Sequence, residues 1–201
     1  MTDAYRFDES STEQAIAYAK IYAGENYSPA METVLKVAFS EKRNLPTFRL
    51  KSSDTILLSG YMKKWVGAYL AGYNNRPSVR TGNCSGTHPD PMAKTILRAR
   101  ISGLEDNLAD KIVARHSLLM TIENNIGELL EEYLSVKLSP LGWYCCWGST
   151  IDAVDFCKAD GSLLQIKTSD NSENSSSSRV RQGTPIGKWF RRFSRRPGVY
   201  N

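Results

Sequence analysis

Residues 149–184 read STIDAVDFCKADGSLLQIKTSDNSENSSSSRVRQGT, and the first twenty of them have a strand-turn-strand pattern. Apolar and polar residues alternate over 150–157 and again over 162–168. The Asp160-Gly161 pair between them suits a tight turn, because both residues tolerate positive φ. The stretch therefore predicts two strands joined as a β-hairpin.

Side chains two positions apart share one face of a strand, so Gln165 and Lys167 lie on the face opposite Leu164 and Ile166. Asp155 precedes Gln165 by ten residues, and the hairpin brings its carboxylate beside Lys167. An Asp and a Lys on adjacent strands suit metal-dependent phosphodiester cleavage, in which carboxylate oxygens hold Mg²⁺ and the ammonium orients the attacking water. The alternative is an ordinary hairpin with two solvated charges.

This arrangement resembles the PD-(D/E)xK nuclease core. Gln165 stands at the second acidic position, so its amide oxygen can coordinate Mg²⁺ but brings no charge, and a further acid is required from elsewhere. Helices followed by strands indicate an α/β fold. The resemblance to the nuclease core implies a small mixed sheet flanked by helices, with an N-terminal helical region.

The missing acid is predicted on the helix that covers most of 104–138. Its apolar residues recur at helical spacing and are expected to face the core: Leu119, Ile122, Ile126, Leu129, Leu130 and Tyr133. Glu131 and Glu123 lie near the edges of that stripe, whereas Glu128 lies opposite it. Glu131 is the first choice and Glu123 the second; the alternative for each is a solvated glutamate.

Three helices are predicted before the nuclease-like part. The first covers 11–23, with a capping box of Ser11 and Gln14 and a stop at Gly24. The second opens at Ser28 and Pro29. The third covers 54–73, and its aromatic stripe is read as core rather than as a base-stacking surface.

Length and composition predict one compact unit, with a helical region over 1–73 packed on a core over 74–201. We expect a soluble, intracellular protein, because the sequence has neither a membrane-length apolar run nor a signal-peptide pattern. The four cysteines form no CxxC pair, and with only two histidines a zinc site or a disulfide framework is unsupported. The thiols are expected to be reduced and mostly buried.

The net charge of +5 is concentrated at the C-terminal end. Residues 174–201 contain seven Lys and Arg and no acidic residue, with Trp189, Phe190 and Phe193 among them. Such a patch favours polyanions, and phosphate contacts would make its binding salt-dependent. A solvated tail and an anionic membrane surface are the alternatives. Arg80, in the loop 74–89, is a second candidate for DNA contact; a merely mobile loop is the alternative there.

The residues also resemble the SinI-type restriction endonucleases over about 75–193. The resemblance rests on NRPSVRTG and GTHPD, ENNIGELLEEYL, AVDFC, and QIKTSDNSENSSSSRVRQGT followed by KWFR. It implies a Type II enzyme that cuts double-stranded DNA at the palindrome GGWCC, where W is A or T. The chain ends at PGVYN, sooner than the resemblance implies, which predicts a shortened member.

The resemblance further implies a homodimer, each subunit cutting one strand with Mg²⁺, and a cognate DNA methyltransferase that acts on the same site. Asp155, Gln165 and Lys167 would form the cleaving rim with Glu131 or Glu123. Guanines of the site are expected to be read by Arg179 and Arg181, because Arg pairs well with guanine O6 and N7. The other predicted DNA contacts are Gln182, Thr184, Asn174, Lys188 and Arg80.

Two other functions fit the same residues. A DNA-binding protein without cleavage is permitted by Gln165 and by the short C-terminus. A repair nuclease or junction resolvase on the same core would lack tight site specificity.

Overall fold

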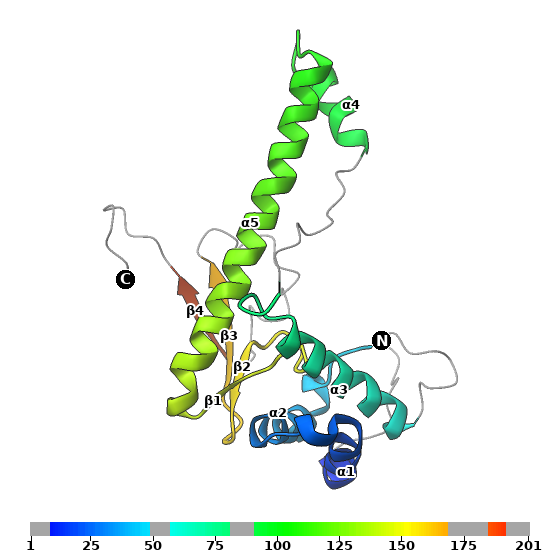
Figure 1. Ribbon diagram of the computed structural model, residues 1–201, viewed down its shortest axis with the longest axis vertical. Coiled ribbons are helices and arrows are strands. Elements are labelled where there is room, and N and C mark those ends of the chain that lie inside the picture. Colours follow the sequence, from blue (N-terminus) through cyan, green and yellow to red (C-terminus); the bar gives the residue numbers. More distant parts are fainter. Residues whose placement is uncertain (1–8, 49–56, 81–90, 169–184, 192–201) are drawn as a thin grey trace. The chain divides into compact units, whose positions relative to one another are not determined.

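A computed structural model describes residues 9–48, 57–80, 91–168 and 185–191 (Figure 1). The helices are α1 (Thr12–Ala23), α2 (Pro29–Ser40), α3 (Leu58–Asn74), α4 (Pro91–Arg100) and α5 (Asp106–Leu138). The strands are β1 (Trp143–Cys145), β2 (Phe156–Lys158), β3 (Leu163–Thr168) and β4 (Ile186–Arg191). The chain divides into two compact units: unit 1 comprises Met1–Arg76 with Glu131–Asn201, and unit 2 comprises Pro77–Leu130.

In unit 1, α1 ends and α2 begins at the predicted residues. Gly24, with φ of 53°, ends α1, and the Ser28 hydroxyl accepts a hydrogen bond from the Met31 N–H, 3.2 Å away, at the start of α2. The predicted capping box at Ser11 is wrong. A short 3-10 helix (Glu9–Ser11) precedes α1, so Ser11 has a helical backbone and its side chain makes no capping hydrogen bond.

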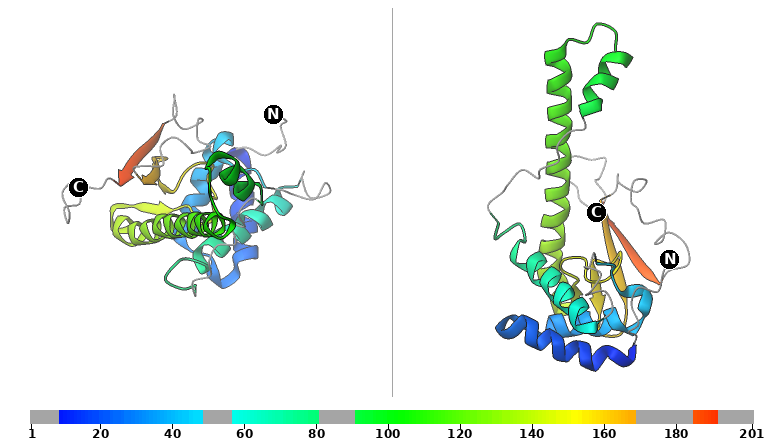
Figure 2. Two further views of the ribbon diagram at one scale, coloured as in Figure 1. Left: turned by 90° about the horizontal axis from the view of Figure 1, so that it is seen from above. Right: turned by 90° about the vertical axis from the view of Figure 1, so that its right-hand side faces the viewer.

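The core of unit 1 lies where the N-terminal helices meet the first strands, and α2 packs against both β1 and β2 (Figures 1 and 2). The stripe of α3 is buried in this core, as predicted, with Trp65 stacked on Tyr69. Other buried members of the core are Met31, Val34, Leu35, Phe39, Tyr61, Met62, Ile151 and Cys157. The aromatic stripe is therefore structural.

The four strands of unit 1 form one sheet in the order β1-β2-β3-β4. β1 and β2 are antiparallel, as are β2 and β3, whereas β4 lies parallel to β3. The predicted α/β arrangement with a small mixed sheet is confirmed. β4 itself was not predicted, and residues 169–184 between β3 and β4 lie outside the described residues.

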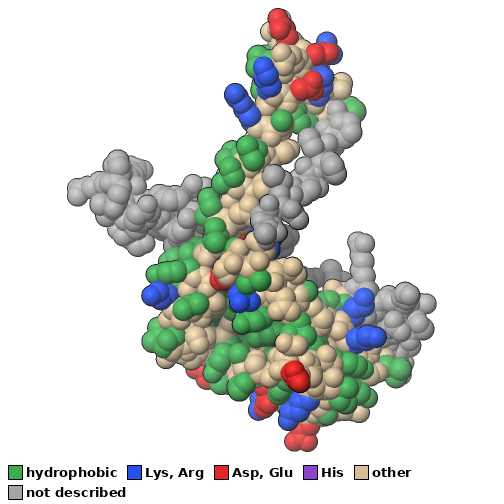
Figure 3. Space-filling model, viewed as in Figure 1, with side chains coloured by type: hydrophobic (Ala, Val, Ile, Leu, Met, Phe, Trp, Pro, Cys, Tyr) green, Lys and Arg blue, Asp and Glu red, His purple; other side chains and the backbone are tan. Residues whose placement is uncertain are grey.

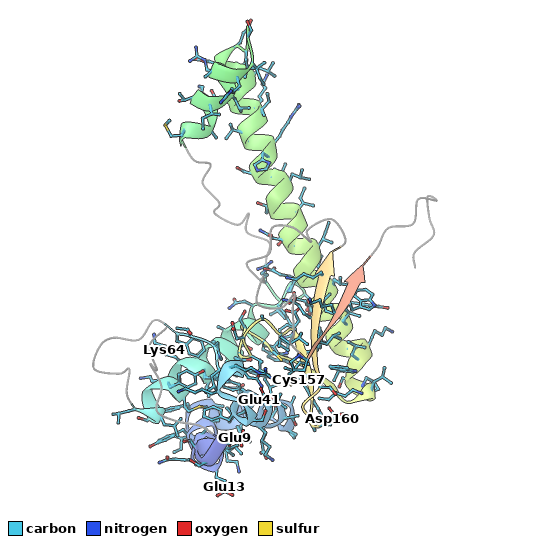
Figure 4. The ribbon with its side chains drawn as sticks, turned by 180° about the vertical axis from the view of Figure 1, so that it is seen from behind. Glu9, Glu13, Glu41, Lys64, Cys157 and Asp160 are labelled. Carbon is cyan, nitrogen blue, oxygen red and sulfur yellow. The ribbon has the colours of Figure 1, made fainter. Side chains whose placement is uncertain are left out.

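The β2–β3 hairpin turns at the predicted dipeptide, and Figure 4 labels Asp160 at its tip. Gly161 has φ of 87°, and the Asp160 carboxylate accepts a hydrogen bond from the Ser162 N–H at 2.9 Å. The Lys158 N–H closes the turn by donating to the Ser162 carbonyl at 2.9 Å. Local turn chemistry therefore fixes this hairpin.

The three cysteines in the described part of the chain, Cys145, Cys146 and Cys157, are free and buried, as predicted. Cys84 lies outside that part. Among the described residues, no helix is both long enough and apolar enough to span a membrane.

Unit 2 contains α4 and the first part of α5, and it does not bury the apolar stripe predicted to face the core. Leu119, Ile122 and Leu129 are all exposed. Among the described residues of this unit, only Ala109 and Thr121 are buried. Hydrophobic periodicity identifies an apolar helix face but does not identify what covers it, and for this reason the prediction is wrong.

Candidate active site

Asp155 lies at the end of the connection between β1 and β2, one residue before β2. Its backbone is held on both sides: its carbonyl accepts from the Cys146 N–H at 2.8 Å, and its N–H donates to the Leu164 carbonyl at 3.0 Å. The strand predicted over 150–157 is therefore too long, since only its last residues belong to β2. The earlier residues bend because Ser149 and Ala153 adopt positive φ, at 55° and 61°.

The carboxylate of Asp155 faces β3. Its Oδ2 accepts a hydrogen bond from the Ile166 N–H at 2.6 Å. Burial raises the pKa of Asp155 to about 6, although the Ile166 N–H and the positive charge of Lys167 both act to lower it. The ionised carboxylate is therefore incompletely compensated by the protein, and a cation or a proton at this position would be stabilised.

Gln165 and Lys167 follow each other on one face of β3. Gln165 is buried, and Lys167 is half-buried and electrostatically coupled to Asp155. The hairpin register pairs Phe156 with Leu164, so Asp155 falls opposite Gln165. On the other side of β3, Gln165 pairs with Lys188 of β4, which is exposed. One row across the sheet thus carries a carboxylate, an amide and an ammonium.

Glu131 approaches the same region from the last turns of α5. The thiol of Cys145 has its pKa raised by burial first, and then by the negative charges of Glu131 and Asp155. Because both carboxylates act on this one buried thiol, both lie within electrostatic reach of the end of β1. In the part of the chain that the structure describes, no three His, Cys, Asp or Glu side chains are grouped as a metal site.

Glu123, the second choice for the missing acid, belongs to unit 2, and its side chain is not described. Arg80 also belongs to unit 2. Its guanidinium donates to the Asn125 side chain at 2.8 Å and pairs with Glu128. The remaining predicted DNA contacts lie outside the described residues: Asn174, Arg179, Arg181, Gln182 and Thr184.

Sequence reasoning missed the contacts that hold the bend before Asp155. Trp65 of α3 donates its Nε1–H to the Thr150 carbonyl at 2.9 Å, and the Asp152 N–H donates to the Asn44 carbonyl at 2.9 Å. Asn44 is buried and donates its side-chain amide to the Val37 carbonyl at 3.0 Å. The available signal was Trp65 itself, because a buried indole N–H requires an acceptor.

A close backbone crossing fixes the same connection. Gly72 of α3 lies against Gly148, whose φ is 69°. A Cβ atom on Gly148 would collide with the Ala68 carbonyl group, and one on Gly72 would collide with the Gly148 backbone. Both positions therefore require glycine. Neither glycine carries a local sequence signal, because the crossing joins segments that are distant in the chain.

A family model described as "SinI restriction endonuclease" matches residues 52–201. The Type II restriction enzyme SinI of Salmonella infantis is 46% identical over 115 residues, which cover 55% of this chain and 50% of that enzyme. The Type II restriction enzyme Eco47I of Escherichia coli is 44% identical over 115 residues, with the same two shares. The chain thus spans about half the length of these curated relatives.

Proposed function

Because the chain belongs to the SinI restriction endonuclease family, we propose that it is a Type II restriction endonuclease that hydrolyses double-stranded DNA at a short palindrome, GGWCC. The observation that carries the proposal is the buried carboxylate of Asp155 coupled to Lys167 on the adjacent strand. Both residues lie within the stretch matched by the family model. We assign residues 74–201 to a PD-(D/E)xK nuclease core, on which the helical region 1–73 packs.

The donor set at Asp155 fits Mg²⁺. A hard cation prefers oxygen ligands, and the Asp155 carboxylate, the Gln165 amide oxygen and the Glu131 carboxylate supply them. The raised pKa of Asp155 supports this assignment, because a buried carboxylate without full compensation favours a bound cation. When bound, Mg²⁺ would polarise the phosphoryl oxygen and lower the pKa of a water molecule.

The protein's own residues have separate roles in this proposal. Lys167 orients the attacking water and neutralises charge that develops on the phosphate. Lys188, exposed on the neighbouring strand and in register with Gln165, holds a backbone phosphate of the DNA at the rim. Arg179 and Arg181 read guanines, and Gln182, Thr184, Asn174 and Arg80 are further DNA contacts.

Two copies of the chain would then act as a homodimer, each subunit cutting one strand of the palindrome. Cleavage at a short site endangers the host genome, so the proposal includes a DNA methyltransferase that modifies the same site. It places the enzyme in the cytoplasm of a prokaryotic cell, where both would meet chromosomal DNA.

The test is plasmid cleavage with Mg²⁺, followed by sequencing of the ends. Asp155→Asn and Lys167→Met are compared with Asp160→Asn and Lys158→Met, matched changes on the same hairpin. We expect discrete ends at GGWCC and a loss of about 100-fold or more in the first pair of variants, with the second pair near wild type. Equal activity in all four variants would refute the site.

A second candidate is a DNA-binding protein that does not cleave. It is favoured by Gln165, a buried neutral side chain at the position of the second acid. Salt-dependent binding to the plasmid without any cleavage would select this function. Cleavage without discrete ends would instead select a repair nuclease on the same core.

A further inference from the structure

The described part of unit 2 has much apolar surface and almost no core. Leu108, Leu119, Ile122 and Leu129 of α5 are each between 46% and 53% exposed, and apolar side chains recur along α5 in Figure 3. Ile96 of α4 is exposed as well. So short a segment of chain cannot bury this surface by itself, and contiguous exposed apolar surface marks an interaction site.

The spacing of the apolar residues defines the shape of the partner. Leu108, Ile112, Leu119, Ile122, Ile126 and Leu129, which we call the α5 seam, alternate by three and four residues except where Arg115 interrupts them. A three-four alternation sustained over 22 residues is the heptad pattern of a helix that packs against another helix. The α5 seam therefore fits a helical partner.

Charge along the seam indicates which helix that partner is. Arg115 lies four residues before Leu119, and Glu123 lies four residues after it. No acidic side chain among the described residues pairs with Arg115. A two-fold axis at Leu119, with the helices antiparallel, brings Arg115 of each copy to the level of Glu123 of the other. A parallel pairing would instead place the two Arg115 residues together within the seam.

We propose that the α5 seam is a self-association surface, on which a second copy of this chain packs its own α5 antiparallel about Leu119. The same axis sets Ile112 opposite Ile126, so apolar residues meet on both sides of the charged level. This inference locates the interface of the homodimer in the proposed function. It is tested without DNA or Mg²⁺, so that the absence of cleavage has no bearing on it.

The first experiment measures the molar mass of the full chain by light scattering after size exclusion. We expect twice the chain mass for the wild type and once the chain mass for Ile122→Asp. Ile21→Asp is the matched control, because it places the same charge on an isoleucine that is 70% exposed in unit 1, and it should remain dimeric. A monomeric wild type, or an Ile122→Asp variant that stays dimeric, would overturn the proposal.

A charge exchange keeps the test decisive if Ile122→Asp fails to fold. Arg115→Glu and Glu123→Arg should each weaken dimerisation by about tenfold or more, and the double variant should restore it. Equal dimerisation in all of these variants would overturn the antiparallel pairing, as would a disulfide between two copies of Ile112→Cys. A wild type whose mass doubles only when DNA is added would overturn DNA-independent self-association.

Discussion

Replacement of Asp155 by asparagine tests whether the buried carboxylate lowers the stability of the fold. Burial raises the pKa of Asp155 from 3.8 to about 6 against the opposing effects of Ile166 and Lys167. A pKa difference of about 2 corresponds to about 3 kcal/mol of unfolding free energy. Asparagine carries no charge, and its amide oxygen can still accept the Ile166 hydrogen bond.

The sign of the effect follows from proton binding. Between about pH 4 and pH 6 the folded protein binds more protons at this residue than the unfolded chain does, so its unfolding free energy falls as the pH rises. Above about pH 6 the wild type has lost the full contribution of about 3 kcal/mol, while Asp155→Asn has lost none of it. The variant should therefore be more stable at neutral pH by up to about 3 kcal/mol and equal to the wild type near pH 4.

Urea unfolding in the presence of EDTA, followed at several pH values, measures this difference directly. Asp160→Asn is the control on the same hairpin. Hydrogen bonds from Ser162 lower the pKa of Asp160, so that carboxylate contributes stability that is lost as the pH falls, and its variant should show the opposite trend. A stability difference between wild type and Asp155→Asn that stays constant with pH would refute the reasoning.

Three further predictions concern the same site. Mg²⁺ should raise the melting temperature of the wild type but not of Asp155→Asn. At an Mg²⁺ concentration 100 times its dissociation constant, binding should add about 2.7 kcal/mol to the unfolding free energy of the wild type. An equal rise in both proteins would show that Asp155 does not hold the metal. Gly148→Ala should lose at least about 3 kcal/mol in urea unfolding, because its Cβ meets the backbone of α3 at a positive φ. Its control is Gly67→Ala, which has open space around its Cβ and should raise the unfolding free energy by about 0.5 to 1 kcal/mol in the same assay. Trp65→Phe should lower the unfolding free energy by about 1 to 3 kcal/mol, because the Thr150 carbonyl loses its hydrogen-bond donor. An unchanged denaturation midpoint would show that this hydrogen bond does not stabilise the fold.

Features set by neighbouring residues could be predicted from the sequence. The Asp160-Gly161 turn fixes the β2–β3 hairpin, and the Ser28-Pro29 pair fixes the start of α2, because in each case the deciding hydrogen bonds join residues a few positions apart. The burial of Trp65 followed from helical periodicity in the same way. The placement of Gln165 and Lys167 on one face of β3 needed only the alternation of a strand.

Features set by distant residues could not be predicted. β4 pairs with β3 across residues 169–184, and no local pattern indicates such a parallel neighbour. The bend before Asp155 depends on Gly148 fitting against α3, a contact between segments more than seventy residues apart. The covering of the exposed stripe of α5 could not be predicted either. An apolar helix face indicates that something covers it but does not identify the partner.

The hydrogen bond from Asp152 to Asn44 has a consequence for modularity. Asn44 precedes the residues that the family model matches, yet it supports the loop that delivers Asp155. The part of the chain that the family model matches, residues 52–201, therefore depends on a residue outside it. A chimaera that joins residues 52–201 to a foreign N-terminal region would keep every candidate site residue. It would lose the hydrogen bond from Asp152 to Asn44, one of the contacts that position Asp155.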